Sequence, residues 1–238
     1  MGFSPSVDIN ADSGKQRLKS PEGSSGNSAG KGSTDTGFLR MLYHAFGLII
    51  PIVYLTLLPD RLLVSRIILA IFLGFLVADI LRFIWPLWNR LVTSLLRGFI
   101  KPDEHNRFNG STYYLLSATL VIYFLHPYIA ATAIFMLSVG DAVACLIGRR
   151  YGTIKLFGGK KSLQGFLALF LTAFALGLIL LPWKLAIVGA FAGAVVEVFP
   201  FHLALGENLA RWLDDNFTIP IASGWAMTGV AILAGWQG

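Results

Sequence analysis

Residues 128–148 read YIAATAIFMLSVGDAVACLIG, an apolar stretch interrupted by one charged residue, Asp141. About 20 consecutive apolar residues suffice for an α-helix to cross the hydrocarbon core of a bilayer. The whole chain has this character, because 55% of its 238 residues are hydrophobic and only 13% are charged. This composition excludes a soluble globular protein, a disordered chain, a collagen and a coiled coil. It predicts an all-α, polytopic transmembrane helix bundle.

The apolar stretches predict about seven spans within one transmembrane domain at 37–238. Between the second and third spans, residues 86–100 (PLWNRLVTSLLRGFI) alternate apolar and basic residues at helical spacing. This pattern predicts an amphipathic helix in the membrane interface, and the alternative is a simple continuation of the second span. The expected spans are 41–58, 64–85, 111–125, 128–148, 162–181, 184–202 and 219–236.

The distribution of Lys and Arg predicts the orientation of these spans. Residues 1–36 are rich in Ser, Gly and Asn, which predicts a disordered tail. If this tail is cytosolic, 16 of the 19 Lys and Arg residues lie on the cytosolic side, and the C-terminus lies on the opposite side. The net charge of +6 is then explained by membrane topology, so no nucleic-acid partner is predicted. The three remaining cations are Arg61, Arg66 and Lys184.

Ionisable residues within or beside the apolar stretches all fall at the predicted cytosolic ends of their helices. Such residues are costly in a membrane and are usually functional. Unrelated polar residues would be scattered over both ends, so the pattern predicts a single site open to the cytosol. The residues are Asp79, Arg82, Asp141, Lys160, Lys161, Glu197, Asp214 and Asp215.

The loop 149–161 (RRYGTIKLFGGKK) is the most basic segment beside this site. Lys160 and Lys161 precede Ser162 at a predicted helix start, where free N–H groups and the helix dipole attract anions. Gly158 and Gly159 allow the backbone to wrap a phosphate. The loop therefore predicts a phosphate site. For Arg149 and Arg150, which precede these residues, the setting of membrane topology is the stronger interpretation.

The carboxylates favour a magnesium site beside this loop. Asp141 and Glu197 are surrounded by small or apolar residues, and Asp214-Asp215-Asn216 directly precedes the last span. Mg²⁺ prefers one or two carboxylates together with substrate phosphates, which Asp141, Glu197 and Asp215 would suit. The alternative for Asp-Asp-Asn is an ordinary helix cap.

Two further pairs lie near the same ends of the first two helices. Asp79 and Arg82 are three residues apart, so they share one helix face. They form either a self-neutralised ion pair or part of the site. Arg40 and His44 are one turn apart, and His44 is a candidate for phosphate contact or proton transfer.

Four motifs in this order resemble the CTP-dependent lipid kinase group. They are SVGDAVACLIGRRYG (138–152), GKKSLQG (159–165), AVVEVFP (194–200) and DDNFTIPI (214–221). That group contains dolichol kinase, phytol kinase and the yeast-type diacylglycerol kinase, and is more distantly related to phosphatidate cytidylyltransferase. The resemblance covers roughly residues 38–230, nearly all of the predicted folded part.

The resemblance implies transfer of the γ-phosphate of CTP to a lipid alcohol, with Mg²⁺ as cofactor. We expect Lys160 and Lys161 to bind phosphates and Glu197 to act as a polar orienter or base. Asp141, Glu197 and Lys161 are the expected catalytic residues, and Asp141, Asp214 and Asp215 are the expected metal ligands. By similarity, the nucleotide site also includes Gly158, Gly159, Ser162, Arg149 and Asn216. Supporting or headgroup-binding residues would be Arg40, His44, Asp79, Arg82, Glu104, Asn109, Gly110 and Ser111.

Other functions stay open at this point. A cytidylyltransferase making a CDP-lipid is one alternative, and a transporter or scramblase of an anionic lipid or solute is another. The lipid itself is not readable from the sequence, and the membrane is either a prokaryotic plasma membrane or the endoplasmic reticulum. Gly189 and Gly193 have the spacing of a GxxxG motif, which packs helices within one chain or in a homodimer.

Overall fold

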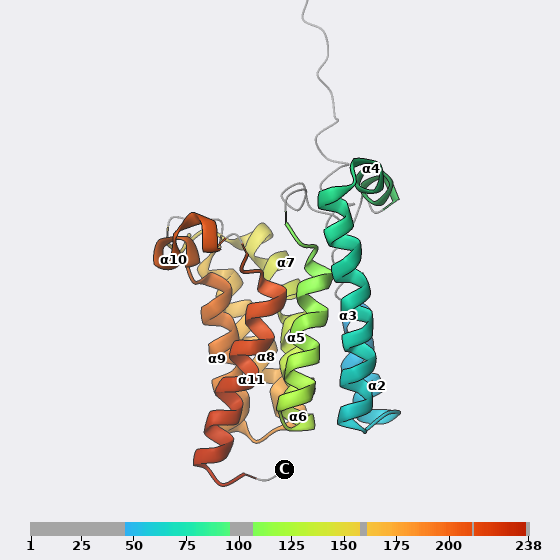
Figure 1. The fold of residues 1–238 in the computed structure, drawn as a ribbon. Helices are drawn as coiled ribbons and strands as arrows, with labels where there is room; N and C mark the ends of the chain where they lie inside the picture. Colours follow the sequence, from blue (N-terminus) through green and yellow to red (C-terminus); the bar gives the residue numbers. More distant parts are fainter. Residues whose placement is uncertain (1–45, 96–106, 158–160, 211, 237–238) are drawn as a thin grey trace, which may run out of the picture.

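The computed structural model describes residues 46–95, 107–157, 161–210 and 212–236. These residues form a bundle of helices, and no strand occurs among them (Figure 1). The helices are α2 (Ile49–Thr56), α3 (Arg61–Ile84), α4 (Pro86–Leu95), α5 (Gly110–Phe124), α6 (Pro127–Phe135), the π-helix η2 (Met136–Asp141), α7 (Ala142–Tyr151), α8 (Leu163–Leu180), α9 (Trp183–Val198), α10 (Phe201–Ala210) and α11 (Asp215–Leu233).

Four helical segments of the described chain are long and apolar enough to cross a membrane. The chain therefore has the all-helical, membrane-type architecture that the sequence predicts. The number of seven spans stays a prediction, because α5 and α9 have only 15 and 16 residues. Part of the first predicted span, and the tail at 1–36, lie outside the described residues. The four segments are Arg61–Ile84, Pro127–Tyr151, Leu163–Leu180 and Asp215–Leu233.

The segment Pro127–Tyr151 is the centre of the bundle. It joins α6, η2 and α7 end to end, and 67% of its most apolar window is buried, compared with 17% for α3. Helices α5, α8, α9 and α11 pack around it, whereas α3 packs chiefly on α5. In Figure 1, α2 and α3 lie on one flank and α9 on the other. A helix as apolar and as exposed as α3 is expected to face lipid.

Proline sets two helix boundaries that differ from the expected ones. Trp85 is extended and ends α3, because a residue before proline disfavours the α conformation. A separate helix, α4, begins at Pro86 and lies across the end of α3 (Figure 1), so a continuous second helix was the wrong alternative. Residues 96–100 lie outside the described part, and the interfacial position of α4 stays a prediction.

The predicted span 184–202 was too long, and a helix was missed after it. Helix α9 ends at Val198, before the Phe199-Pro200 pair. The missed helix is α10, which is broken at Gly206 by a φ of 75°, a conformation that glycine adopts readily. The last helix begins at Asp215 rather than at residue 219.

The GxxxG motif packs helices within this chain. A Cβ atom on Gly189 would lie 2.6 Å from Sδ of Met227, and one on Gly193 would lie 2.6 Å from Oγ of Ser223. Met227 and Ser223 are both buried on α11, so the two glycines allow α9 and α11 to approach closely. The homodimer expected as an alternative is not required by this motif.

Gly177 offers a test of close helix packing. A Cβ atom there would lie 2.8 Å from Cβ and 3.1 Å from Cα of Ala186 on α9, a neighbour with no flexible side chain. We expect Gly177→Ala to lower the free energy of unfolding by about 1–3 kcal/mol through overpacking. Gly74→Ala on α3, which has no atom within 4 Å of the added carbon, is the matched control. Equal thermal unfolding midpoints for the two variants in detergent would contradict this packing.

Candidate functional site

Most of the described charged residues belong to one end of the bundle, the end where α4, α7 and α10 lie (Figure 1). Helices α3 and α9 end there, and α5, α8 and α11 begin there. We call this the site end. The predicted residues that lie at the site end within the described ranges are Asp79, Arg82, Asn109, Gly110, Ser111, Asp141, Arg149, Lys161, Ser162, Glu197, Asp214, Asp215 and Asn216.

Lys161 joins two carboxylates from different helices. Its Nζ donates to Oε1 of Glu197 at 2.6 Å and to Oδ2 of Asp215 at 2.9 Å. The three residues stand beside the start of α8, the end of α9 and the start of α11, and we call them the Lys161 cluster. The side chain of Glu197 is 6% exposed, compared with 39% for Lys161 and 36% for Asp215. The cluster is therefore closed on the Glu197 side and open on the other.

Lys161 is a fixed cation. Burial by itself would lower the pKa of its ammonium group, but Asp215, Glu197 and Asp141 together raise that pKa above its usual value. An ordinary lysine already titrates near pH 10.4. Lys161 therefore stays charged at any physiological pH and is not suited to proton abstraction.

Glu197 retains an unused acceptor at this buried position. Its Oε2 has no hydrogen-bond partner among the described residues, while its Oε1 binds Lys161. A buried carboxylate oxygen without a donor is costly, and it can accept a proton, a hydroxyl or a metal. Among the described residues, this oxygen is therefore available to a further partner.

Asp141 reaches the same cluster from the centre of the bundle. Asp141 is buried at 3% exposure, and it lies close enough to Lys161 to raise the pKa of the lysine. Asp141 ends the π-helix η2, and single π turns inside α-helices often occur at functional sites. The π turn was not predicted, because nothing in MLSVGD (136–141) distinguishes it from an α-helical sequence.

The Asp-Asp-Asn motif forms the helix cap that was one of its two alternatives, and its metal role stays a prediction. Asp214 caps α11, since its Oδ1 accepts the backbone N–H of Asn216 at 2.9 Å and the side-chain amide at 2.6 Å. Asn216 is held further by Ser117, whose hydroxyl donates to its carbonyl at 2.8 Å. Asp215 belongs to the Lys161 cluster. The cap uses one carboxylate oxygen of Asp214 and the side-chain amide of Asn216. These contacts give no support to the predicted metal role of Asp214 or to the predicted nucleotide role of Asn216.

The basic loop is folded back against the start of α8. The backbone N–H of Leu156 donates to the Lys161 carbonyl, and that of Leu163 donates to the Ile154 carbonyl. Ser162 is buried, and its Oγ accepts the N–H of Gly165 as the cap of α8. This hydroxyl therefore fixes the loop, and its predicted contact with phosphate stays a prediction. Arg149 and Arg150 are exposed on α7.

Asp79 and Arg82 form a buried clamp rather than an open site. Arg82 donates to Oδ1 of Asp79 at 2.7 Å. The backbone N–H of Asn109 and the hydroxyl of Thr112 donate to Oδ2 at 2.8 and 2.6 Å. Asn109 in turn caps α5 by accepting from the N–H of Ser111. The pair thus ties the end of α3 to the start of α5. The contribution of Thr112 to this clamp was not predicted from the sequence.

Six of the predicted residues lie outside the described part of the chain. They include two of the expected phosphate-binding glycines and one of the two lysines. The six are Arg40, His44, Glu104, Gly158, Gly159 and Lys160.

The described carboxylates fit a metal that is shared with a substrate. In the described ranges, no three His, Cys, Asp or Glu side chains are arranged to hold a metal by themselves. Mg²⁺ does not need such a cage, because it usually takes one or two carboxylates together with substrate phosphates. The buried carboxylate of Asp141 and the partly exposed carboxylate of Asp215 are suitable hard ligands.

Curated proteins from yeasts and a cyanobacterium are similar to this chain. The CTP-dependent diacylglycerol kinase 1 of Schizosaccharomyces pombe is 31% identical over 176 residues, which cover 67% of this chain and 78% of the relative. The protein of that name from Saccharomyces cerevisiae is 26% identical over 190 residues, covering 67% and 61%. The phytol kinase of a Synechocystis strain is 33% identical over 123 residues, covering 48% and 51%. No protein-family model and no solved structure matches the chain.

Proposed function

The chain belongs to the family of CTP-dependent lipid kinases, and we propose that its Lys161 cluster is the site at which CTP phosphorylates a lipid alcohol. The observation that supports this most is the fixed cation between two carboxylates from different helices. It stands at one end of a membrane-type bundle, where a water-soluble nucleotide and a lipid hydroxyl can meet. Phosphoryl transfer depends chiefly on such positioning and charge stabilisation.

The acceptor we propose is a hydroxyl on a long apolar chain. Diacylglycerol is the first candidate, because the relative that is matched over most of its length is named as a diacylglycerol kinase. Phytol is the second, from the names of other relatives. Dolichol and other polyprenols, which the sequence resemblance includes, have the same chemistry.

We assign a different step of the reaction to each of two described residues, Lys161 and Glu197. Lys161 holds phosphate oxygens of CTP and stabilises the charge that develops during transfer. The lipid oxygen forms a bond to the γ-phosphorus while the bond from that phosphorus to the β–γ bridging oxygen breaks, which releases CDP. The hydroxyl proton passes to Oε2 of Glu197, the buried acceptor with no partner among the described residues.

Magnesium is part of this proposal. Asp141 and Asp215 would hold Mg²⁺, which neutralises charge on the phosphates when it is bound. We expect chelation by EDTA to stop phosphoryl transfer and added Mg²⁺ to restore it. Asp215→Asn should raise the Mg²⁺ concentration for half-maximal rate, and should also weaken the binding of Mn²⁺ measured by electron paramagnetic resonance. A rate that is unchanged in EDTA would contradict the metal assignment.

The proposed topology places this site in the cytosol. Seven spans with the N-terminus inside would bring the site end to the cytosolic face, where most Lys and Arg residues lie. The four long apolar helical segments support an integral membrane location. Labelling of single cysteines introduced at exposed Lys155 and at Lys184, in a Cys145→Ala background, would test it. We expect an impermeant reagent outside the cell to modify only position 184.

The release of CDP by the purified protein tests the proposed reaction. We expect CDP and a phosphorylated lipid in equal amounts with diacylglycerol or phytol, and a slower reaction with ATP. Triacylglycerol, which has the same chains but no hydroxyl, is the matched control and should give no product. CDP release that is the same with and without a lipid hydroxyl would reduce the activity to hydrolysis and contradict the proposal.

A further inference from the structure

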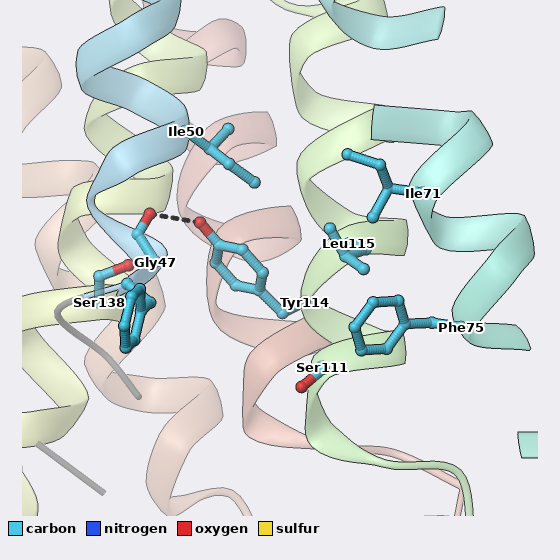
Figure 2. A pocket seen from close by; sticks show the side chains of 9 residues that line it. Gly47, Ile50, Ile71, Phe75, Ser111, Tyr114, Leu115 and Ser138 are labelled. Carbon is cyan, nitrogen blue, oxygen red and sulfur yellow. Dashed lines mark hydrogen bonds between the residues drawn. The ribbon is translucent and has the colours of Figure 1, made fainter. Parts of the chain in front are cut away.

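An apolar pocket lies beside the site, on the other side of η2. Its volume is about 200 Å³, and it is lined by residues of α2, α3, α5 and η2 and of the segment just before α2 (Figure 2). Ile50 and Ile71 lie at one end of it, and Ser111 lies at the other (Figure 2). The lining residues are Phe46, Gly47, Ile50, Ile71, Phe75, Ser111, Tyr114, Leu115 and Ser138.

The polar part of the pocket points to a ligand with a hydroxyl. Ser138 is 3% exposed, and its Oγ has no hydrogen-bond partner among the described residues. The Tyr114 hydroxyl, by contrast, donates to the carbonyl of Gly47 (Figure 2). Leaving a buried hydroxyl unpaired costs about 1–3 kcal/mol, which a ligand hydroxyl at this point would offset.

This hydroxyl is adjacent to the phosphoryl-transfer site. Ser138 precedes Asp141 by three residues within the same short π-helix, η2. Ser111 is the second residue of α5, at the site end. Ser111 therefore lies at the end of the pocket nearest the site end, Ser138 lies beside Gly47 on the flank of the pocket away from α3, and the two isoleucines lie at the end opposite Ser111 (Figure 2).

The α3 side of the pocket opens toward lipid. Ile71 and Phe75 are 46% and 44% exposed on α3, and α3 is a candidate membrane span. An apolar cavity of roughly 150 Å³ can hold one benzene ring, so this pocket accommodates a segment of a chain and not a whole lipid. The remainder of the chain would extend past α3 into the bilayer.

We propose that this pocket binds the acceptor lipid, with the chain next to its hydroxyl between α3 and α5 and the hydroxyl beside Ser138. The occupant is an amphiphile with one free hydroxyl on an apolar chain. The proposal rests on the proposed function, because it names the entry site of the acceptor in that reaction. Gly47 contributes by its lack of a side chain, since a Cβ there would lie 2.8 Å from Oγ of Ser138.

Photo-crosslinking tests this pocket without any need for turnover. The probe is a diacylglycerol whose acyl chain carries a diazirine near the glycerol, added to the full chain in detergent without CTP. We expect crosslinks on the α3 and α5 peptides that contain Ile71, Phe75 and Leu115. Ile71→Trp should reduce them about tenfold by filling the pocket. Leu73→Trp is the matched control, because Leu73 is 49% exposed on the same helix and does not line the pocket.

Competition separates the acceptor from ordinary bilayer lipid. Unlabelled diacylglycerol should displace the probe, whereas phosphatidylcholine, which has the chains but no free hydroxyl, should not. Ser138→Ala gives a second readout, an increase of about tenfold in KM for diacylglycerol with an unchanged KM for CTP. Crosslinks that persist in Ile71→Trp, or that phosphatidylcholine displaces equally well, would overturn the pocket assignment. Crosslinking as expected in a protein that transfers no phosphate would instead refute the proposed function.

Discussion

Replacing Lys161 with methionine is expected to lower kcat for phosphoryl transfer by roughly 10²–10³-fold, the usual effect of removing one preorganised charge-stabilising group. Methionine keeps most of the side-chain length but removes the cation between Glu197 and Asp215. The rate of lipid phosphorylation at saturating CTP measures this effect. Lys155→Met, which removes an exposed cation from the same loop, is the matched control and should stay within about twofold of the unmodified protein.

The loss of activity in Lys161→Met must be separated from a loss of folding. Glu197 is buried and would be left without its partner, so a lower unfolding temperature is also expected. Lys161→Arg retains the charge and should restore most of the stability but little of the rate, because guanidinium differs in geometry from ammonium. Wild-type kcat in Lys161→Met would show that the cluster is structural and would refute its role in phosphoryl transfer.

Replacing Asp79 with alanine is expected to cause the largest loss of stability. It leaves the buried Arg82 guanidinium without its carboxylate and removes the acceptor of Asn109 and Thr112. Breaking one partner of a buried ion pair costs about 3–5 kcal/mol. In a chain of this size that corresponds to a fall of about 10 °C in the midpoint of thermal unfolding. Circular dichroism of the detergent-solubilised protein measures it.

A double substitution distinguishes a clamp from a substrate contact. Asp79→Leu with Arg82→Met replaces the charges by apolar groups of similar size, and should recover part of the stability lost in either single variant. Asp60→Ala, which removes the exposed cap of α3, is a milder control at about 1 kcal/mol. If Asp79→Ala kept its unfolding temperature but lost its affinity for lipid, the pair would contact the headgroup and the clamp would be wrong.

The sequence predicts much of this fold because apolar length sets helix position in a membrane. The predicted span 162–181 differs from α8 by one residue at each end. Errors arise where capping or proline acts locally. Helix α3 begins at Arg61 rather than at residue 64, because Asp60 caps it by accepting from two backbone N–H groups. Asp214 has the same effect on α11, and the Phe199-Pro200 pair shortens α9.

The gathering of charge at one end was also predictable, but the contacts were not. Helix length and direction place Lys161 and Glu197 at the same end although 36 residues separate them. Their ion pair depends on how α8, α9 and α11 rotate against one another, which helical periodicity in nearly uniform apolar segments does not specify. The hydrogen bond from Thr112 to Asp79, across 33 residues, also depends on how the helices pack and could not be predicted. The same is true of the unpaired Oγ of Ser138.

The most direct test of the central proposal is to follow the two ends of the CTP triphosphate in one reaction. CTP with distinguishable α and γ labels is incubated with the purified protein, Mg²⁺, diacylglycerol and phosphatidic acid. The γ label alone should appear on diacylglycerol, in wild type and Lys155→Met but not in Lys161→Met. The α label on phosphatidic acid would contradict the proposal by making the protein a cytidylyltransferase. If neither label reached a lipid, a transporter or scramblase would become the leading interpretation of the Lys161 cluster.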